Sequence, residues 1–173
     1  MNRNRLLVTA AAVFAVVGVA IVAMPRLQAG THQANLAVSA SVSANCRLTA
    51  GTLAFGPYDP VVTHASTDLD VDGTFTVACT KNAASVWIGM DNGLNYSGGR
   101  RMQIGATGNY LSYLLYKEGG RTNLWTDGLP ANGVSYSPTS KDPYTMTVYG
   151  RVAAGQDVAV GSYTDTVVMT VNF

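Results

Sequence analysis

Residues 35–43 read Asn-Leu-Ala-Val-Ser-Ala-Ser-Val-Ser, and Cys46 follows three positions later. Apolar side chains alternate with small or polar ones along this stretch, at Leu36, Val38, Ala40 and Val42. Because successive side chains of a β-strand point to opposite sides, these four residues would share one apolar face. A strand of this kind needs a sheet to complete, and that sheet belongs either to this chain or to a neighbouring molecule.

The residues before this stretch are typical of an export signal. Arg3 and Arg5 give a basic start, residues 6–23 are uncharged and largely apolar, and Ala29 is a small residue at a suitable cleavage position. The alternative is a retained membrane anchor, because the run 6–23 just reaches the length that spans a bilayer. We expect residues 1–29 to be a signal peptide.

The charge balance excludes several classes of partner. Cleavage after Ala29 would remove three of the 11 Lys and Arg residues and none of the 10 acidic residues, which leaves a net charge of about −2. No basic face would then favour nucleic acid or anionic lipid. Only 12% of the residues are charged, and this composition suits an exported β-protein better than a cytosolic enzyme.

The chain has two cysteines, Cys46 and Cys79. In an oxidising compartment two cysteines most simply form one disulfide, which would stabilise the fold by roughly 3–4 kcal/mol. A free redox thiol and a metal ligand are the alternatives. The sequence has neither a Cys-x-x-Cys motif nor a histidine close to either cysteine, so these alternatives are disfavoured.

Short alternating runs continue along the chain and indicate strands. They occur at Phe75, Val77 and Cys79, at Val86, Ile88 and Met90, at Met146 and Val148, within residues 110–116, and at Val167, Met169, Val171 and Phe173. Turn signals such as Asp72-Gly73 and Asn132-Gly133 separate them, and two prolines make residues 135–143 the expected long loop. No segment after the signal holds a helical period, so we predict an all-β sandwich or barrel.

Residues able to carry chemistry are scarce. His32 and His64 are interpreted as solvated loop histidines. Alternate aspartates followed by Gly73 resemble the first half of a calcium loop, at Asp68, Asp70 and Asp72. The twelfth position of that loop is Cys79, which favours an acidic turn before a strand. With no base beside a nucleophile, we expect no enzyme, cofactor, metal or small-molecule substrate.

Two tryptophans offer a different kind of site. An exposed pair, Trp87 and Trp125, could hold sugar rings, although a tryptophan in a sandwich more often packs over a sheet. One candidate function is therefore that of a self-complete secreted sandwich that binds carbohydrate through Trp87, Trp125 or nearby tyrosines.

Several runs occur in one order along most of the chain after the signal. They are Asn35–Cys46, Gly51-Thr52-Leu53-Ala54-Phe55-Gly56-Pro57-Tyr58-Asp59-Pro60, Val77-Ala78-Cys79, Arg121-Thr122-Asn123-Leu124-Trp125, Thr147-Val148-Tyr149-Gly150-Arg151, Gly161-Ser162-Tyr163-Thr164-Asp165-Thr166-Val167 and the terminal Phe173. In this ordered set the chain resembles the spore coat protein U domain family, which is similar to the subunits of archaic chaperone–usher pili.

The resemblance implies an incomplete immunoglobulin-like β-sandwich that lacks its last strand. In such subunits a periplasmic chaperone lends a strand, and at the outer-membrane usher the N-terminal segment of the next subunit replaces it. The expected partners are therefore a periplasmic chaperone, an outer-membrane usher and further copies of this or related subunits.

The family's functional residues can be carried over onto this sequence. The resemblance implies a donor-strand segment over residues 30–45, with its face at Leu36, Val38, Ala40 and Val42, and a domain over residues 46–173. Val167, Met169, Val171 and Phe173 match the final strand, which forms one edge of the acceptor groove, and Cys46 and Cys79 match the disulfide pair. The implied function is a structural subunit of a surface fibre or spore coat, exported through the periplasm to the cell surface.

Overall fold

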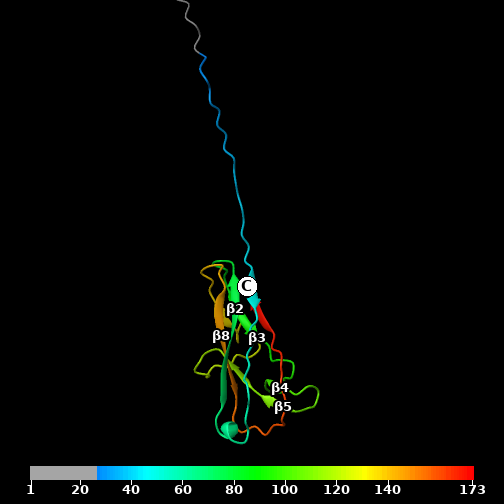
Figure 1. Cartoon of the computed structure of the whole chain (residues 1–173). Coiled ribbons are helices and arrows are strands. Elements are labelled where there is room, and N and C mark those ends of the chain that lie inside the picture. Colours follow the sequence, from blue (N-terminus) through cyan, green and yellow to red (C-terminus); the bar gives the residue numbers. More distant parts are fainter. Residues whose placement is uncertain (1–26) are drawn as a thin grey trace, which may run out of the picture. The chain divides into compact units, whose positions relative to one another are not determined.

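The computed structural model describes residues 27–173, and these residues form an all-β fold with one turn of 3-10 helix (Figure 1). The strands are β1 (Cys46–Thr49), β2 (Leu69–Cys79), β3 (Val86–Met90), β4 (Arg101–Gln103), β5 (Tyr110–Ser112), β6 (Leu114–Tyr116), β7 (Val134–Tyr136), β8 (Tyr144–Val152) and β9 (Met169–Asn172), and the helical turn η1 is Thr63–Ala65. The basic start and the apolar run of the expected signal peptide lie outside the described residues. Among residues 27–173, no helix has the length and hydropathy needed to cross a bilayer.

The larger sheet is antiparallel and has the strand order β1-β2-β8-β6. Its centre is the long pair β2 and β8, which lie side by side in Figure 1. Their register runs from Leu69 opposite Val152 to Val77 opposite Tyr144. Phe75, Val77 and Cys79 are buried at alternate positions of β2, as the sequence pattern predicts. β1 is an edge strand of this sheet.

The second sheet has the strand order β7-β3-β9, and β4 pairs with β5 in a separate two-stranded ribbon. Val86, Ile88 and Met90 of β3 are buried, which confirms the second alternating run. Because β9 pairs only with β3, no strand of the described chain is hydrogen-bonded to its other edge.

The two sheets bury their inner faces against each other. One cluster combines Phe75 and Val77 of β2, Ile88 of β3, Leu115 of β6 and Val148 of β8. Trp125 lies in the same cluster with no exposed surface, and its ring centre is 6.0 Å from that of Phe75. The molecule is therefore a β-sandwich with a single apolar core.

Three sequence predictions need correction. Residues 110–116 form two strands in different sheets, β5 and β6, because the chain changes sheets at Tyr113. The expected loop over residues 135–143 begins later, since Ser135 belongs to the edge strand β7. Asp72-Gly73 is not a turn but part of β2, where the missing side chain of Gly73 leaves space for Leu53.

Residues 27–45 contain no strand, and every one of their side chains is exposed. The chain divides into one unit that ends at Ser39 and a second that begins at Ala40, and all strands belong to the second unit. Leu36, Val38 and Val42 are 87%, 85% and 84% exposed, so an alternating apolar pattern occurs here without a sheet of its own.

Candidate strand-acceptor groove

An apolar groove opens between two extended segments of the chain, residues 50–55 and residues 163–169. The hollow has a volume of about 470 Å³. Its floor is built by core side chains from both sheets, from the β4–β5 ribbon and from the connection between β5 and β6, namely Phe75, Met90, Met102, Tyr113, Leu115 and Val148. The hollow thus reaches the core of the sandwich, and most of the core side chains at this floor are almost fully buried beneath it.

A second hollow of about 620 Å³ lies next to the first, between residues 53–60 and 158–163. The two hollows share four lining residues, Leu53, Phe55, Met102 and Tyr163. They therefore form neighbouring parts of one long depression, which we call the acceptor groove.

Close approach to two glycines shapes the first wall. After β1 the chain crosses the inner face of the larger sheet, and Leu53 packs against Gly73 of β2 and Gly150 of β8. A Cβ atom at Gly150 would lie 2.7 Å from Leu53 Cδ2 and 2.8 Å from Phe55 Cζ. The two glycines allow residues 51–55 to lie directly on the sheet, which is possible only where no side chain intervenes.

The second wall leaves an unpaired backbone edge. Gln103 and Thr164 exchange two backbone hydrogen bonds of 2.8 and 3.0 Å, the Leu94 N–H donates to Thr166 O at 3.2 Å, and the Asp91 N–H donates to Val168 O at 3.0 Å. Because backbone groups of an extended chain alternate in direction, Asp165 and Val167 turn theirs to the opposite side. Within residues 27–173 the N–H and C=O groups of these two residues have no hydrogen-bond partner.

The Asp165 carboxylate fixes this wall to the rest of the domain. Its Oδ1 accepts hydrogen bonds from the Leu94 and Asn95 N–H groups at 3.0 and 3.3 Å, and its Oδ2 accepts one from the Tyr113 hydroxyl at 2.7 Å. Tyr113 is 5% exposed, and burial together with this hydrogen bond raises the pKa of its hydroxyl. The neutral hydroxyl of Tyr113 thus donates to the Asp165 side chain at the groove floor.

Arg100 stabilises the loop between β3 and β4, which contacts this wall. Its guanidinium is buried and donates to backbone carbonyls of Met90, Asp91 and Trp125, while burial lowers its pKa. The Asp91 carboxylate in turn accepts the Val168 N–H at 2.9 Å. Carbonyl partners satisfy the buried cation, and the loop that carries it holds the start of β9 in place.

The predicted final-strand residues are partly brought together at the groove. Val167 and Met169 line the groove, and both pack against the core. Val171 of β9 also packs against the core and lies opposite Ile88 of β3. Phe173 follows β9 and is 49% exposed. The predicted donor residues Leu36, Val38, Ala40 and Val42 lie in the exposed segment before β1 and occupy no strand of the described chain.

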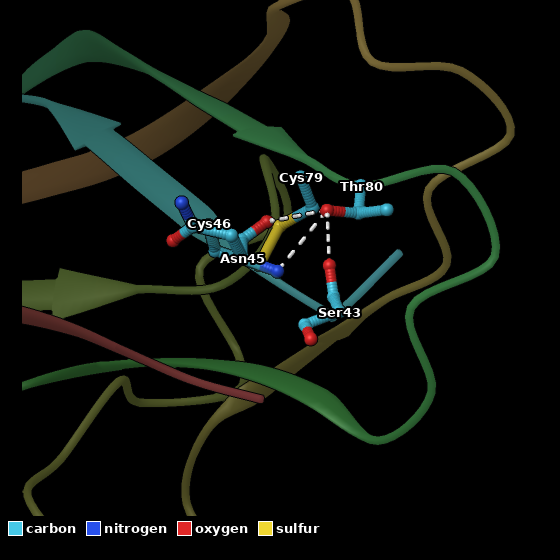
Figure 2. Close-up of a disulfide and its surroundings, with 5 residues drawn as sticks. All are labelled: Ser43, Asn45, Cys46, Cys79 and Thr80. Carbon is cyan, nitrogen blue, oxygen red and sulfur yellow. Dashed lines mark hydrogen bonds between the residues drawn. A yellow bond between two sulfur atoms is a disulfide. The ribbon is translucent and has the colours of Figure 1, made fainter. Parts of the chain in front are cut away.

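The two cysteines are joined by a disulfide that links the first residue of β1 to the last residue of β2 (Figure 2). Cys46 and Cys79 are also directly opposite each other in the strand register. The predicted disulfide is therefore present, and the described chain has no free cysteine.

The remaining sequence candidates have structural roles. The interpretation of His64 as a solvated loop residue is wrong, because its ring stacks on Tyr58 with centres 5.0 Å apart and it is 9% exposed. His32 lies in the exposed segment before β1. Trp125 is fully buried and Trp87 is half-buried in β3, which agrees with the packing interpretation.

The three alternating aspartates do not form an ion loop. Asp70 and Asp72 lie within β2, and Asp68 directly precedes it. Arg151 forms two hydrogen bonds of 2.7 Å with Asp70, which lower the pKa of that carboxyl, and Arg121 pairs with Asp72 at 2.5 Å. The aspartates therefore form ion pairs with Arg151 of the neighbouring strand β8 and with Arg121 of the connection between β6 and β7.

Comparison with known proteins places this geometry in context. The family model described as the Spore Coat Protein U domain matches residues 32–170. "Protein U" of Myxococcus xanthus is 37% identical over 170 residues, which cover 88% of this chain and 91% of that protein. A chain of the CsuC-CsuE chaperone-tip adhesion subunit pre-assembly complex, from the archaic chaperone-usher Csu pili of Acinetobacter baumannii, is similar in fold with a TM-score of 0.52 and 19% identity. That match covers 76% of this chain and 40% of the other.

Proposed function

Because the chain belongs to the spore coat protein U domain family, we propose that it is a structural subunit of a surface fibre or coat that polymerises by donor-strand complementation. The observation that carries this proposal is the acceptor groove, which combines an open apolar floor with an unpaired backbone edge at Asp165 and Val167. A strand from another molecule would satisfy both features at once.

The groove is unsuited to a molecule that stays alone. Exposed core side chains and unpaired strand edges promote aggregation. An incoming strand would pair its backbone with the free edge and place alternate side chains in the hollows. Assembly is therefore the state in which this sandwich is complete.

The exposed segment before β1 supplies a matching strand. Its apolar side chains alternate over residues 36–42, as a strand with one buried face requires. Burial of Leu36, Val38 and Val42 would contribute roughly 5–9 kcal/mol before ordering costs. The donor segment and the groove are different surfaces of the chain. When two subunits join, one donor segment and one groove therefore stay free at the two ends, and the product is an open fibre.

The proposed mechanism involves three kinds of partner. A periplasmic chaperone would fill the groove of the newly exported chain with one of its own strands. At an outer-membrane usher, the donor segment of another copy of the chain would replace the chaperone's strand. The similar fold of a chain from a chaperone–subunit complex supports the chaperone step. The route is export, transit through the periplasm and incorporation into a surface fibre or coat.

The carbohydrate-binding alternative receives no support from the tryptophans. Trp125 has no exposed surface and its indole packs against Phe75, so a sugar could reach it only if the core opened. We therefore retain the assembly function alone.

The test is a pair of substitutions on opposite faces of the donor segment. Val38→Asp would place a charge in an apolar groove, where desolvation is costly. Ser39→Asp introduces the same charge on the other face and serves as the control. We expect Val38→Asp to retain the chaperone complex and to lose polymer, while Ser39→Asp retains both. Normal polymers of Val38→Asp, or loss of its chaperone complex, would contradict the donor assignment.

A further inference from the structure

Residues 43–45 leave the domain along one side chain, that of Thr80 (Figure 2). The Thr80 hydroxyl accepts a hydrogen bond from the Asn45 N–H at 3.1 Å. Its single proton can be donated to Ser43 O at 3.3 Å or to Asn45 O at 3.4 Å. One side chain thus contacts the backbone of two of the last three residues before β1.

These bonds continue the pairing of β1 with β2. Cys46 lies opposite Cys79 and is joined to it, and one step further the Thr80 N–H donates to Asn45 O at 2.8 Å. The hydroxyl of Thr80 then extends the contact to Ser43. The chain therefore keeps the direction of β1 up to Ser43, and the disulfide fixes the start of β1 to β2.

This direction decides which groove the donor segment can reach. The chain's own groove is lined by residues 50–55, which follow β1 directly. Residues 36–42 could enter it only if the chain reversed within residues 43–45 and returned along β1. Tight reversals of this kind favour glycine or asparagine at their central positions. Among residues 43–45 only Asn45 is one of these, and both its N–H and its C=O are hydrogen-bonded to Thr80. The reversal would also break the bonds to Thr80.

We propose that Thr80 is a positioning residue for assembly. Its hydroxyl holds residues 43–45 in line with β1, so the donor segment is presented to another subunit and is kept from closing the groove of its own chain. This inference rests on the proposed function, because it assumes that the donor segment fits such a groove.

The test compares Thr80→Val with Thr76→Val. Valine retains the shape of threonine and, at position 80, the backbone bond to Asn45, but it removes the hydroxyl. Thr76 lies in β2, four positions before Thr80, and its hydroxyl makes no hydrogen bond within the described residues, so it is the matched control. Each exported chain is purified with its cognate chaperone and released, with or without excess synthetic peptide of residues 30–45. Three products are then separated by size and mass: polymer, peptide-bound subunit, and closed monomer, in which the donor segment fills the groove of its own chain.

Loss of one hydrogen bond should raise the ratio of closed monomer to polymer about five-fold in Thr80→Val and leave it unchanged in Thr76→Val. Amide exchange at Asn45 should accelerate in Thr80→Val by a similar factor. If the wild-type groove takes up the peptide but the variant's ratio and exchange are unchanged, the positioning role is overturned while the proposed function stands. If the wild-type groove takes up no peptide, the proposed function fails and this inference fails with it.

Discussion

Removal of the Tyr113 hydroxyl should weaken the domain at the groove wall. Tyr113 is 5% exposed and donates a 2.7 Å hydrogen bond to the Asp165 carboxylate. A hydrogen bond to a charged group contributes about 1.5–3 kcal/mol, so we expect Tyr113→Phe to lower the free energy of unfolding by that amount. Asp165 would retain its bonds to Leu94 and Asn95, so the wall should loosen without leaving its place.

Tyr163→Phe is the matched control for this change. Its hydroxyl lies on the same wall and donates a 2.7 Å hydrogen bond to a neutral acceptor, the Ala159 carbonyl, in an exposed position. That bond should contribute only about 0.5–1.5 kcal/mol. Both variants are unfolded in urea with the groove filled by the peptide of residues 30–45, and the fluorescence of the buried Trp125 reports the transition. A loss for Tyr113→Phe no larger than that for Tyr163→Phe would refute the role given to the carboxylate.

Three further predictions concern the rest of the domain. Replacement of both Cys46 and Cys79 by serine should lower the free energy of unfolding, measured by urea denaturation, by about 3–4 kcal/mol. If the wild-type chain, denatured without reductant, reacts with thiol reagents, the disulfide is absent and this prediction fails. Hydrogen bonds from the backbone of residues 122 and 123 lower the pKa of Glu118 to about 2, so its contribution to stability is complete above the unfolded pKa of about 4.3 and disappears as the pH falls toward 2. The urea midpoint of Glu118→Gln should therefore be below wild type at pH 7 and converge with it at pH 2, and a constant difference would count against this linkage. Gly150→Ala should displace Leu53 and lower the free energy of unfolding by about 1–3 kcal/mol. Thermal melting should show a lower melting temperature, and an unchanged one would contradict the packing of Leu53 on Gly150.

Periodicity alone predicts the central part of this fold. The buried positions of β2 and β3 follow the alternation of Phe75, Val77, Val86 and Ile88, because a sandwich buries one face of each strand. The export context predicts the disulfide, since two cysteines in an oxidising compartment have one simple pairing.

Local signals fail where distant residues decide the conformation. Asp72-Gly73 looks like a turn because the sequence does not reveal that Leu53 packs over Gly73. The burial of His64 depends on stacking with Tyr58, which no spacing indicates. The bonds of Asp165 to Leu94 and Tyr113 join residues 71 and 52 positions apart in the chain, so the groove wall follows from tertiary contacts alone.

Site-directed cross-linking between subunits tests donor-strand complementation most directly. Val167 lines the groove, so in Val167→Cys a thiol would face an inserted strand. Each position from 36 to 42 is replaced by cysteine in turn in that background, and polymers are oxidised and separated without reductant. Because only side chains on the same face of paired strands can meet, we predict ladders of cross-linked subunits for cysteines at even positions, strongest at the one opposite Val167, and none for those at 37, 39 and 41. Equal cross-linking at odd and even positions, or cross-links confined to single chains, would contradict donor-strand complementation.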